Sequence, residues 1–389
     1  MKDKSFLSMI KKNIMTVILV LVYLFFVVLT KGGIFKPSSF SELVNQNAYV
    51  YILGVGMLMC MLTGGNVDLS CGSFVCLLGA LGGLFMVVKG MNVALAIALI
   101  LAIGLIYGLI LGFLIAYVHI PPWIATLAGY LSFRGLGTSI LSSNSTTGSI
   151  AAFPKSFENI FYGRIFSTTP GVFNWVCFIC GIVAAALVVL LAVNNRKTRI
   201  KKHYEVEPLK LTAVKCVLEC GVIILLMSRL AMNGGIPTAM VWVVAIVLIY
   251  SFITARTTIG RHFYVVGGNI ETARLSGVNT RRIMLLAYLN MAFLTSITAM
   301  CVVSRSDSAY ADIGKNFEMD AISACVVGGV SATGGAGSVF GMVVGATLIG
   351  VINLGMSLIS MDMDWQRVVK GFVLLAAVVF DILSKKRES

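Results

Sequence analysis

The sequence predicts an all-α polytopic membrane protein with about 10–12 transmembrane helices, some of them broken at glycine-rich points. Of its 389 residues, 58% are hydrophobic and only 12% are charged, and the mean hydropathy is +0.95. A soluble domain has about 45–50% apolar and about 25% charged residues, so a chain of this composition cannot cover itself with polar surface. Repeated apolar stretches of about 17–25 residues, the length that crosses a bilayer, support the same prediction.

Ten apolar stretches are strong candidate spans, and two weaker stretches complete a set of twelve. The ten are 14–30, 48–62, 72–88, 91–118, 172–194, 212–232, 238–254, 283–303, 338–359 and 366–384. The two weaker ones are 123–141 and 321–331. The basic N-terminal stretch runs directly into the first span, and no small-residue cleavage site follows it. We therefore interpret that span as a retained helix rather than a signal peptide.

The basic residues predict which loops face the cytoplasm. If twelve spans alternate from a cytoplasmic N-terminus, 19 of the 30 lysines and arginines fall in the segments left inside. Lysine and arginine accumulate in such loops, so the net charge of +14 indicates orientation rather than nucleic-acid binding. Both termini are expected in the cytoplasm. The long outside loops are 142–171, with a short amphipathic helix expected around FPKSFENIF (153–161), and 304–320.

Two Thr-Gly-Gly sequences indicate an internal two-fold repeat. TGGNVDLSCGSFVCLLGALGGLF (63–85) and TGGAGSVFGMVVGATLIG (333–350) each lead from a break into a helix with spaced glycines. Transporters built from two related halves place broken, glycine-rich helices at matching positions near the substrate path. Chance recurrence among 39 glycines is the alternative.

Polar residues at the first break are candidates for the lining of a translocation path. Asp68 follows Asn66 and precedes two serines, so it either caps the helix that restarts there or lines the path, and the two roles are compatible. The full candidate set is Thr63, Asn66, Asp68, Ser70, Ser73 and, in the second half, Asn353.

Few residues suit catalysis, metal binding or ion coupling. No P-loop sequence is present, so nucleotide-derived energy would come from another protein, and we identify no catalytic, cofactor or metal site. The acidic residues at plausible membrane depth are Asp68, Glu219 and Asp381, which is a small number for an ion-driven carrier. Cys177 and Cys180, a C-x-x-C pair inside an apolar span, are interpreted as packing residues.

The polar run VGGNIETARLSGVNTRR (266–282), between apolar spans, predicts a short cytoplasmic helix. The letters VVGGN are expected to form a turn, followed by about two helical turns over 271–276, with Asn269 as N-cap and Gly277 ending the helix. Because Leu275 is apolar, this helix suits docking into a groove on a soluble partner. The alternative is an ordinary cytoplasmic loop with basic residues.

Five blocks of the sequence, in order, resemble bacterial sugar ABC transporter permeases of the ribose/xylose/galactose branch. They are TGGNVDLSCGS, PPWIATLAGYLSFRGL, GRHFYVVGGNIETARLSGVN, FEMDAISACVVGGVSATGGAGSVFGMVVGATLIGVINLGMSL and DWQRVVKGFVLLAAVVFDI, and they cover 45–384 almost continuously. The chain is longer than ribose-type members by about one helix pair. This length favours the xylose-type or multiple-sugar permeases.

The resemblance implies a non-catalytic transport subunit in the bacterial inner membrane, surrounded by lipid. It implies two permease copies as a homodimer, a separate cytoplasmic ABC ATPase, and an extracytoplasmic sugar-binding protein. The residues that match the ATPase-contacting motif are Gly267, Gly268, Asn269, Glu271, Ala273, Arg274, Leu275, Ser276 and Gly277. Thr272 stands where the pattern often has alanine, and Cys71 where small aliphatic residues are usual.

The chain is accordingly expected to form one permease domain over 1–389. Its expected parts are a first half (14–194), a basic cytoplasmic loop (195–215), an extra helix pair (216–254), a cytoplasmic coupling segment (255–282) and a second half (283–389). The expected substrate is xylose or a related pentose or hexose. The alternatives are another small solute, such as a nucleoside or an autoinducer-type sugar, or an ion-coupled secondary transporter.

Overall fold

The computed structural model describes residues 14–169, 172–204, 206 and 209–386. This part of the chain is mostly helical and has very little strand, and seven of its helices are long and apolar enough to cross a membrane. Helices are the expected form because the bilayer interior leaves every backbone N–H and C=O to be satisfied within its own segment. The all-α polytopic prediction is confirmed.

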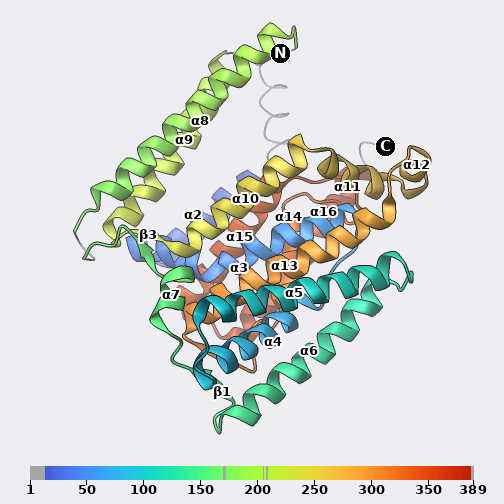
Figure 1. Ribbon diagram of the computed structural model, residues 1–389. Helices are drawn as coiled ribbons and strands as arrows, with labels where there is room; N and C mark the ends of the chain where they lie inside the picture. Colours follow the sequence, from blue (N-terminus) through green and yellow to red (C-terminus); the bar gives the residue numbers. More distant parts are fainter. Residues whose placement is uncertain (1–13, 170–171, 205, 207–208, 387–389) are drawn as a thin grey trace.

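The elements follow one another as named in Figure 1. They are α2 (Ile14–Leu29), η1 (Gly33–Phe35), α3 (Pro37–Leu62), α4 (Cys71–Gly83), η2 (Leu84–Val88), α5 (Val93–Ala116), α6 (Pro122–Asn144), β1 (Ser149–Ala151), α7 (Lys155–Phe161), β2 (Arg164–Ile165), α8 (Trp175–Lys201), α9 (Leu209–Met232), β3 (Ile236–Pro237), α10 (Thr238–Arg256), α11 (Thr258–Gly268), α12 (Ile270–Leu275), α13 (Thr280–Ser306), β4 (Ser308–Tyr310), α14 (Phe317–Val327), α15 (Val339–Leu358) and α16 (Met363–Lys386).

Each of the twelve predicted spans coincides with a helix, although some bounds differ. α3 begins at Pro37 rather than near 48, because proline is well suited to the first helical position and the added turns are buried in the core. The amphipathic helix expected around 153–161 is α7, whose Phe157 and Phe161 are buried. The basic stretch 195–215 is mostly helix rather than loop, because α8 and α9 extend into it from both sides.

Helices in the middle of the molecule are largely buried, and those around it expose apolar side chains. α3, α13, α14 and α15 lie centrally (Figure 1), and every residue of α3 from 47 to 62 is buried. The outer helices α5, α8 and α10 are mostly exposed although they are strongly apolar. An apolar exterior around a packed interior is what a lipid environment requires.

The α8–α9 hairpin stands away from the remaining helices (Figure 1). α9 packs against α8 and also contacts α3, whereas α10 packs against α3, α11 and α15. The distance between the Cys177 sulfur, on α8, and the Met227 carbonyl oxygen, on α9, is 3.7 Å. Cys177 therefore serves in packing this hairpin, in agreement with its interpretation from the sequence.

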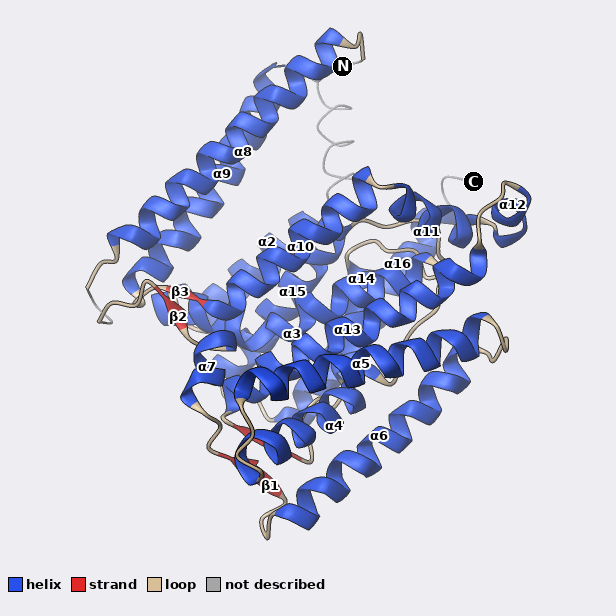
Figure 2. Ribbon diagram, viewed as in Figure 1, coloured by secondary structure: helices blue, strands red, loops and turns tan. Residues whose placement is uncertain are grey.

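All four short strands lie at one end of the helices, and α11 and α12 lie at the other (Figure 2). β1 pairs antiparallel with β4, with Ile150 opposite Ala309, and β2 pairs antiparallel with β3, with Ile165 opposite Ile236. We call the end of the molecule that carries the strands the strand end, and the opposite end the α11–α12 end. The two ends locate the sites described below.

Two short helices, α4 and α14, meet at their N-termini. Each follows a long helix and a non-helical stretch, and the long helices α3 and α13 finish at opposite ends of the molecule. A Cβ on Gly72 would overlap the Gly314 carbonyl oxygen, and a Cβ on Gly314 would overlap that of Gly72. The stretch 307–316 precedes α14 as the first Thr-Gly-Gly stretch precedes α4, whereas the second Thr-Gly-Gly follows α14 and leads towards the longer α15.

Candidate functional site

The helix α12 is fixed at both ends by its own sequence. The Asn269 Oδ1 accepts a hydrogen bond from the Thr272 N–H at 2.9 Å, which confirms the N-cap prediction. Gly277 adopts φ +79° and its N–H donates to the Arg274 carbonyl, so it ends the helix as predicted. The predicted VVGGN turn is wrong, because α11 stays helical through Gly268 and the extended Asn269 alone separates it from α12.

The residues of α12 differ sharply in exposure. Ala273 is fully buried, whereas Leu275 is 88% exposed and Ile270 is 47% exposed. Glu271 and Arg274 are exposed as well. The helix therefore packs against α11 and α13, with Ala273 on its buried side. Its exposed side carries Leu275 close to the charged side chains of Glu271 and Arg274.

One contact between α11 and the rest of the molecule is made by glycines alone. A Cβ on Gly267 would overlap the Leu62 carbonyl oxygen at the end of α3, and the Gly335 N–H donates to that same oxygen at 3.2 Å. A Cβ on Gly65 would overlap the Ala332 carbonyl oxygen. We call this contact the glycine junction. Its members are Gly64, Gly65, Gly267, Gly334 and Gly335.

The glycine junction unites three segments that lie far apart in the sequence. Both Thr-Gly-Gly sequences meet there, at the α11–α12 end, and Gly267 of the predicted ATPase-contacting motif lies against them. No side chain separates the three backbones at these contacts. Because packed protein interiors have low compressibility, a displacement of α11 would pass directly to the end of α3 and to the stretch before α15.

Polar residues of the first break form a hydrogen-bonded cluster around Asp68. Its Oδ1 accepts from the Ser70 N–H at 2.8 Å and from the Ser70 hydroxyl at 2.6 Å, and that hydroxyl lies 2.7 Å from the Tyr107 hydroxyl. Asp68 thus closes a turn onto Ser70 and does not cap α4, whose N-cap position is Ser70 itself. Thr63 and Asn66 bond to carbonyls of 60 and 63, so they stabilise the preceding turn.

Buried carboxylates are more numerous than the sequence pattern indicated. Glu318 and Asp320 are 2% and 4% exposed in the first turn of α14, where carboxylates suit the positive end of the helix dipole. Both were assigned to the outside loop 304–320. Glu219, in contrast, is exposed, and the side chain of Asp381 lies outside the described residues. The sequence-based argument that the chain has too few buried carboxylates for ion coupling therefore does not hold.

The place where α4 meets α14 contains polar atoms without partners. The Glu318 Oε2 and the Ser73 hydroxyl are buried and accept or donate no hydrogen bond within the described part of the chain. A Cβ on Gly72 would overlap the same Glu318 oxygen, so the two helix N-termini and the carboxylate are in direct contact. An acidic pair in the first turn, FEMD, is the sequence signal that could have located this helix start.

Asn353 belongs to a different place from the other candidate path residues. Its Nδ2 donates to the Asn47 Oδ1 at 3.2 Å, between α15 and α3. It also borders a polar cavity of about 350 Å³ near Tyr310 of β4. Of the six candidate path residues, all within the described structure, Asn353 alone lines this cavity.

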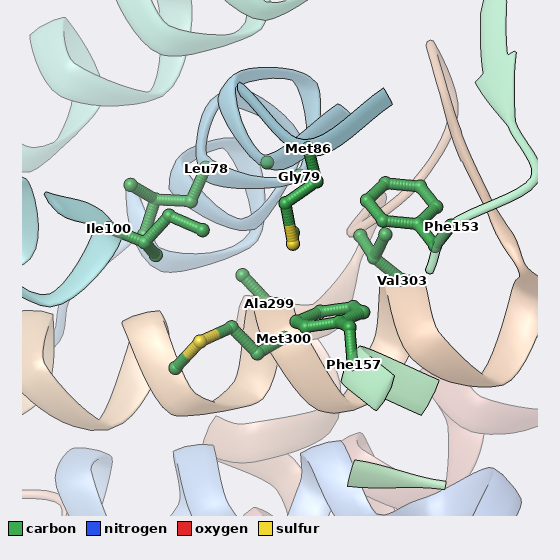
Figure 3. A pocket seen from close by; sticks show the side chains of 10 residues that line it. Leu78, Gly79, Met86, Ile100, Phe153, Phe157, Ala299, Met300 and Val303 are labelled. Atoms are coloured by element: carbon green, nitrogen blue, oxygen red, sulfur yellow. The ribbon is translucent and has the colours of Figure 1, made fainter. Parts of the chain in front are cut away.

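A much smaller void of about 10 Å³ lies between α4, α5, α7 and α13. Figure 3 shows it enclosed by apolar side chains, among them Met86, Phe153, Phe157 and Met300. A void of this size holds about one water molecule at most, and its lining offers that water no polar side chain. It is a packing void and adds no functional residue.

Comparisons with known proteins give matches along nearly the whole chain. A family model described as branched-chain amino acid transport system / permease component matches residues 39–378. The xylose transport system permease protein XylH of Haemophilus influenzae is 34% identical over 374 residues, which cover 96% of each chain. XylH of Escherichia coli K12 is 32% identical over 376 residues, 96% of this chain and 92% of that protein. The ribose import permease protein RbsC of Bacillus subtilis is 31% identical over 346 residues, 89% of this chain and 85% of that protein. No solved structure matches the chain significantly.

Proposed function

The chain belongs to the family of permease components of branched-chain amino acid transport systems, and we propose that it is the membrane subunit of an ATP-driven monosaccharide importer. Its near-full-length relatives are permeases named for xylose and ribose transport. The proposed substrate is therefore xylose or a related pentose or hexose. Like those relatives, the chain is a transport component and not an enzyme.

Two observations together support the proposal: α12 is exposed, and α11 lies in direct backbone contact with the end of α3. Leu275 and its charged neighbours are available to a partner, while Gly267 lies against the end of α3 without an intervening side chain. An ATPase that grips α12 and changes shape on binding ATP would displace α11. The glycine junction would then carry the displacement into the membrane helices.

We assign three partners to this subunit. A cytoplasmic ABC ATPase would bind the α11–α12 end, and an extracytoplasmic sugar-binding protein would dock on the strand end. A second copy of the chain would complete the translocation path. In this arrangement both termini face the cytoplasm, in agreement with the distribution of lysine and arginine along the sequence.

A second candidate function, ion-coupled transport, draws on the buried Asp68 and Glu318. Intramembrane carboxylates of this kind carry protons or sodium ions in secondary carriers. Against it stands the similarity of nearly the whole chain to permease components of transport systems, because the resemblance to ABC permeases implies that a separate ATPase supplies the energy. The relatives named for xylose and ribose also favour a simple pentose or hexose as the substrate, rather than a nucleoside or an autoinducer-type sugar.

The proposal is tested by uptake into proteoliposomes that contain the permease with its ATPase and receive the binding protein outside. We expect accumulation of labelled xylose or a related sugar that requires ATP inside and both partner proteins. The control is the same permease without the ATPase under a proton or sodium gradient. Sugar uptake in that control, or ATP-driven uptake of leucine but of no sugar, would contradict the proposal.

A further inference from the structure

The polar cavity of about 350 Å³ near the strand end has the size of a site for one small molecule. We call it the strand-end chamber. Its walls include Asn45, Tyr49, Phe317, Asp320, Asn353 and Lys370. Small-molecule sites are concave, have volumes of about 300–1,000 Å³, and combine apolar walls with a few placed polar groups. The chamber lies at the lower end of that range.

The charges around the chamber are already balanced. Four basic side chains border it, and within the described structure each has a carboxylate partner. The pairs are Lys370 with Asp320 at 3.0 Å, Lys315 with Asp312 at 3.2 Å, Arg367 with Asp364 at 2.6 Å, and Arg305 with Glu42. Of these four, only the Lys370–Asp320 pair is largely buried, and a charged ligand that broke this pair would leave one member without compensation. An uncharged ligand would not.

Hydrogen-bonding capacity remains at the chamber after these pairs are formed. The Tyr49 hydroxyl donates to the Asp320 Oδ2 at 2.5 Å, so this carboxylate is shared between α3 and α16. The Oδ1 atoms of Asn45 and Asn353 are buried and have no hydrogen-bond partner. Buried acceptors without a donor are uncommon and costly. These oxygens have no exposed surface, so a rotation of either carboxamide would be needed to bring its oxygen to the chamber, where a ligand hydroxyl could donate to it.

One wall of the chamber is aromatic. The rings of Tyr49 and Phe317 stack with centroids 3.7 Å apart and planes 17° apart, which holds α3 against the start of α14. Such a pair gives a rigid apolar surface next to the Asp320 carboxylate and the two carboxamides. A monosaccharide has the complementary chemistry, because its ring carries C–H faces and its edge carries hydroxyl groups.

We propose that the strand-end chamber binds one uncharged monosaccharide within a single permease chain. This inference rests on the proposed function and deepens it, since it gives the permease a sugar affinity of its own in addition to that of a binding protein. Asn45, Tyr49 and Asn353 are assigned as ligand-binding residues, and the Lys370–Asp320 pair positions the Tyr49 hydroxyl. The charge balance of the walls disfavours phosphorylated sugars and amino acids as ligands.

The test is binding of radiolabelled xylose and ribose to the purified full-length permease in lipid nanodiscs, with no ATPase or binding protein present. We expect saturable binding that is weakened about tenfold by Tyr49→Phe, which keeps the stacked ring, and by Asn45→Leu, which removes an unpartnered group. Tyr51→Phe is the matched control, because Tyr51 lies on the same helix and bonds Thr347 at 3.0 Å but does not border the chamber. Thermal unfolding of each variant verifies folding.

Absence of saturable sugar binding, or an equal loss of affinity in Tyr51→Phe, would overturn the proposal. Stronger binding of leucine or of a sugar phosphate than of the free sugar would also overturn it. ATP-driven uptake is measured with the same wild-type preparation after adding the ATPase and the binding protein. Intact uptake without permease binding refutes the chamber alone, whereas absence of ATP-driven uptake refutes the proposed function.

Discussion

Two neighbouring glycines in α11 have opposite surroundings. A Cβ on Gly267 would overlap the Leu62 carbonyl oxygen and lie 2.6 Å from the Gly335 nitrogen, whereas nothing lies within 4 Å of a Cβ on Gly268. The atoms that meet Gly267 belong to backbone, which cannot move aside as a flexible side chain can. A single methyl group at this position therefore forces α11 away from α3.

We expect Gly267→Ala to destabilise the permease by about 1–3 kcal/mol through overpacking and to lower ATP-driven uptake several-fold. Gly268→Ala adds a methyl group in open space within a helix, so we expect a neutral effect or a stabilisation of up to about 1 kcal/mol. The measurements are thermal unfolding of the purified chain and uptake in proteoliposomes. Similar unfolding temperatures for the two variants would show that the glycine junction is not tightly packed.

At the scale of elements, local signals in the sequence predict much and tertiary contacts account for the remainder. The helices that coincide with the twelve predicted stretches follow from hydropathy alone, and the ends of α12 follow from bonds between residues about three positions apart. The start of α14 was missed because Asp320 is stabilised by Tyr49 and Lys370, which lie 271 and 50 positions away. The acidic pair in FEMD could have indicated a helix start, but no pattern within 304–320 shows that Asp320 is buried against these two distant partners, so the carboxylate was assigned to a loop.

The coupling segment, 255–282, also has features that the sequence predicts and features that depend on tertiary contacts. Its outward residues, such as Leu275, were predicted as partner-contacting from the family motif, and their exposure agrees with that role. The inner contact of Gly267 with the end of α3 and with Gly335, in the stretch before α15, joins segments that lie about 200 and about 70 residues away in the sequence. A glycine pair in a sequence indicates a turn as readily as a close contact, so the VVGGN turn was predicted instead of a continuous helix.

For α12 we expect Glu271→Ala and Arg274→Ala each to weaken binding of the ATPase about five- to tenfold and to lower uptake, with membrane insertion unchanged. Truncating a central interface residue commonly has an effect of this size. Binding is measured by titrating the purified ATPase onto the permease in nanodiscs. Arg282→Ala is the control, because Arg282 is equally basic and exposed at the start of α13.

Unchanged ATPase binding in both α12 variants would refute the coupling role of this helix. A loss in Arg282→Ala as large as that in Arg274→Ala would indicate general electrostatic attraction between the two proteins and not docking on α12. Added salt separates these cases further, since exposed charges are screened within about 10 Å at 0.1 M ionic strength.

At the scale of the whole molecule, α14 connects the strand-end chamber with the glycine junction. Asp320 in its first turn borders the chamber, and the stretch that follows its last turn reaches the junction at Ala332. Its 11 residues span about 16 Å as a helix. The Gly72–Gly314 contact braces the start of α14 against α4. A displacement of α11 therefore has a short route, through the stretch 328–332 and the helix α14, to the carboxylate that bonds Tyr49.

This route predicts that the nucleotide bound to the ATPase alters the sugar affinity of the chamber. Coupling free energies between sites are typically about 1–3 kcal/mol, or about 5–150-fold in affinity, and they are reciprocal. We expect a non-hydrolysable ATP analogue to change xylose affinity in the permease–ATPase complex, and xylose to change analogue affinity by the same factor. Gly267→Ala should bring both factors close to one without altering sugar affinity in the absence of nucleotide, because it disturbs the junction and not the chamber. Gly268→Ala should keep both factors. If Gly267→Ala keeps the same change in sugar affinity and in analogue affinity as Gly268→Ala, coupling does not pass through the glycine junction.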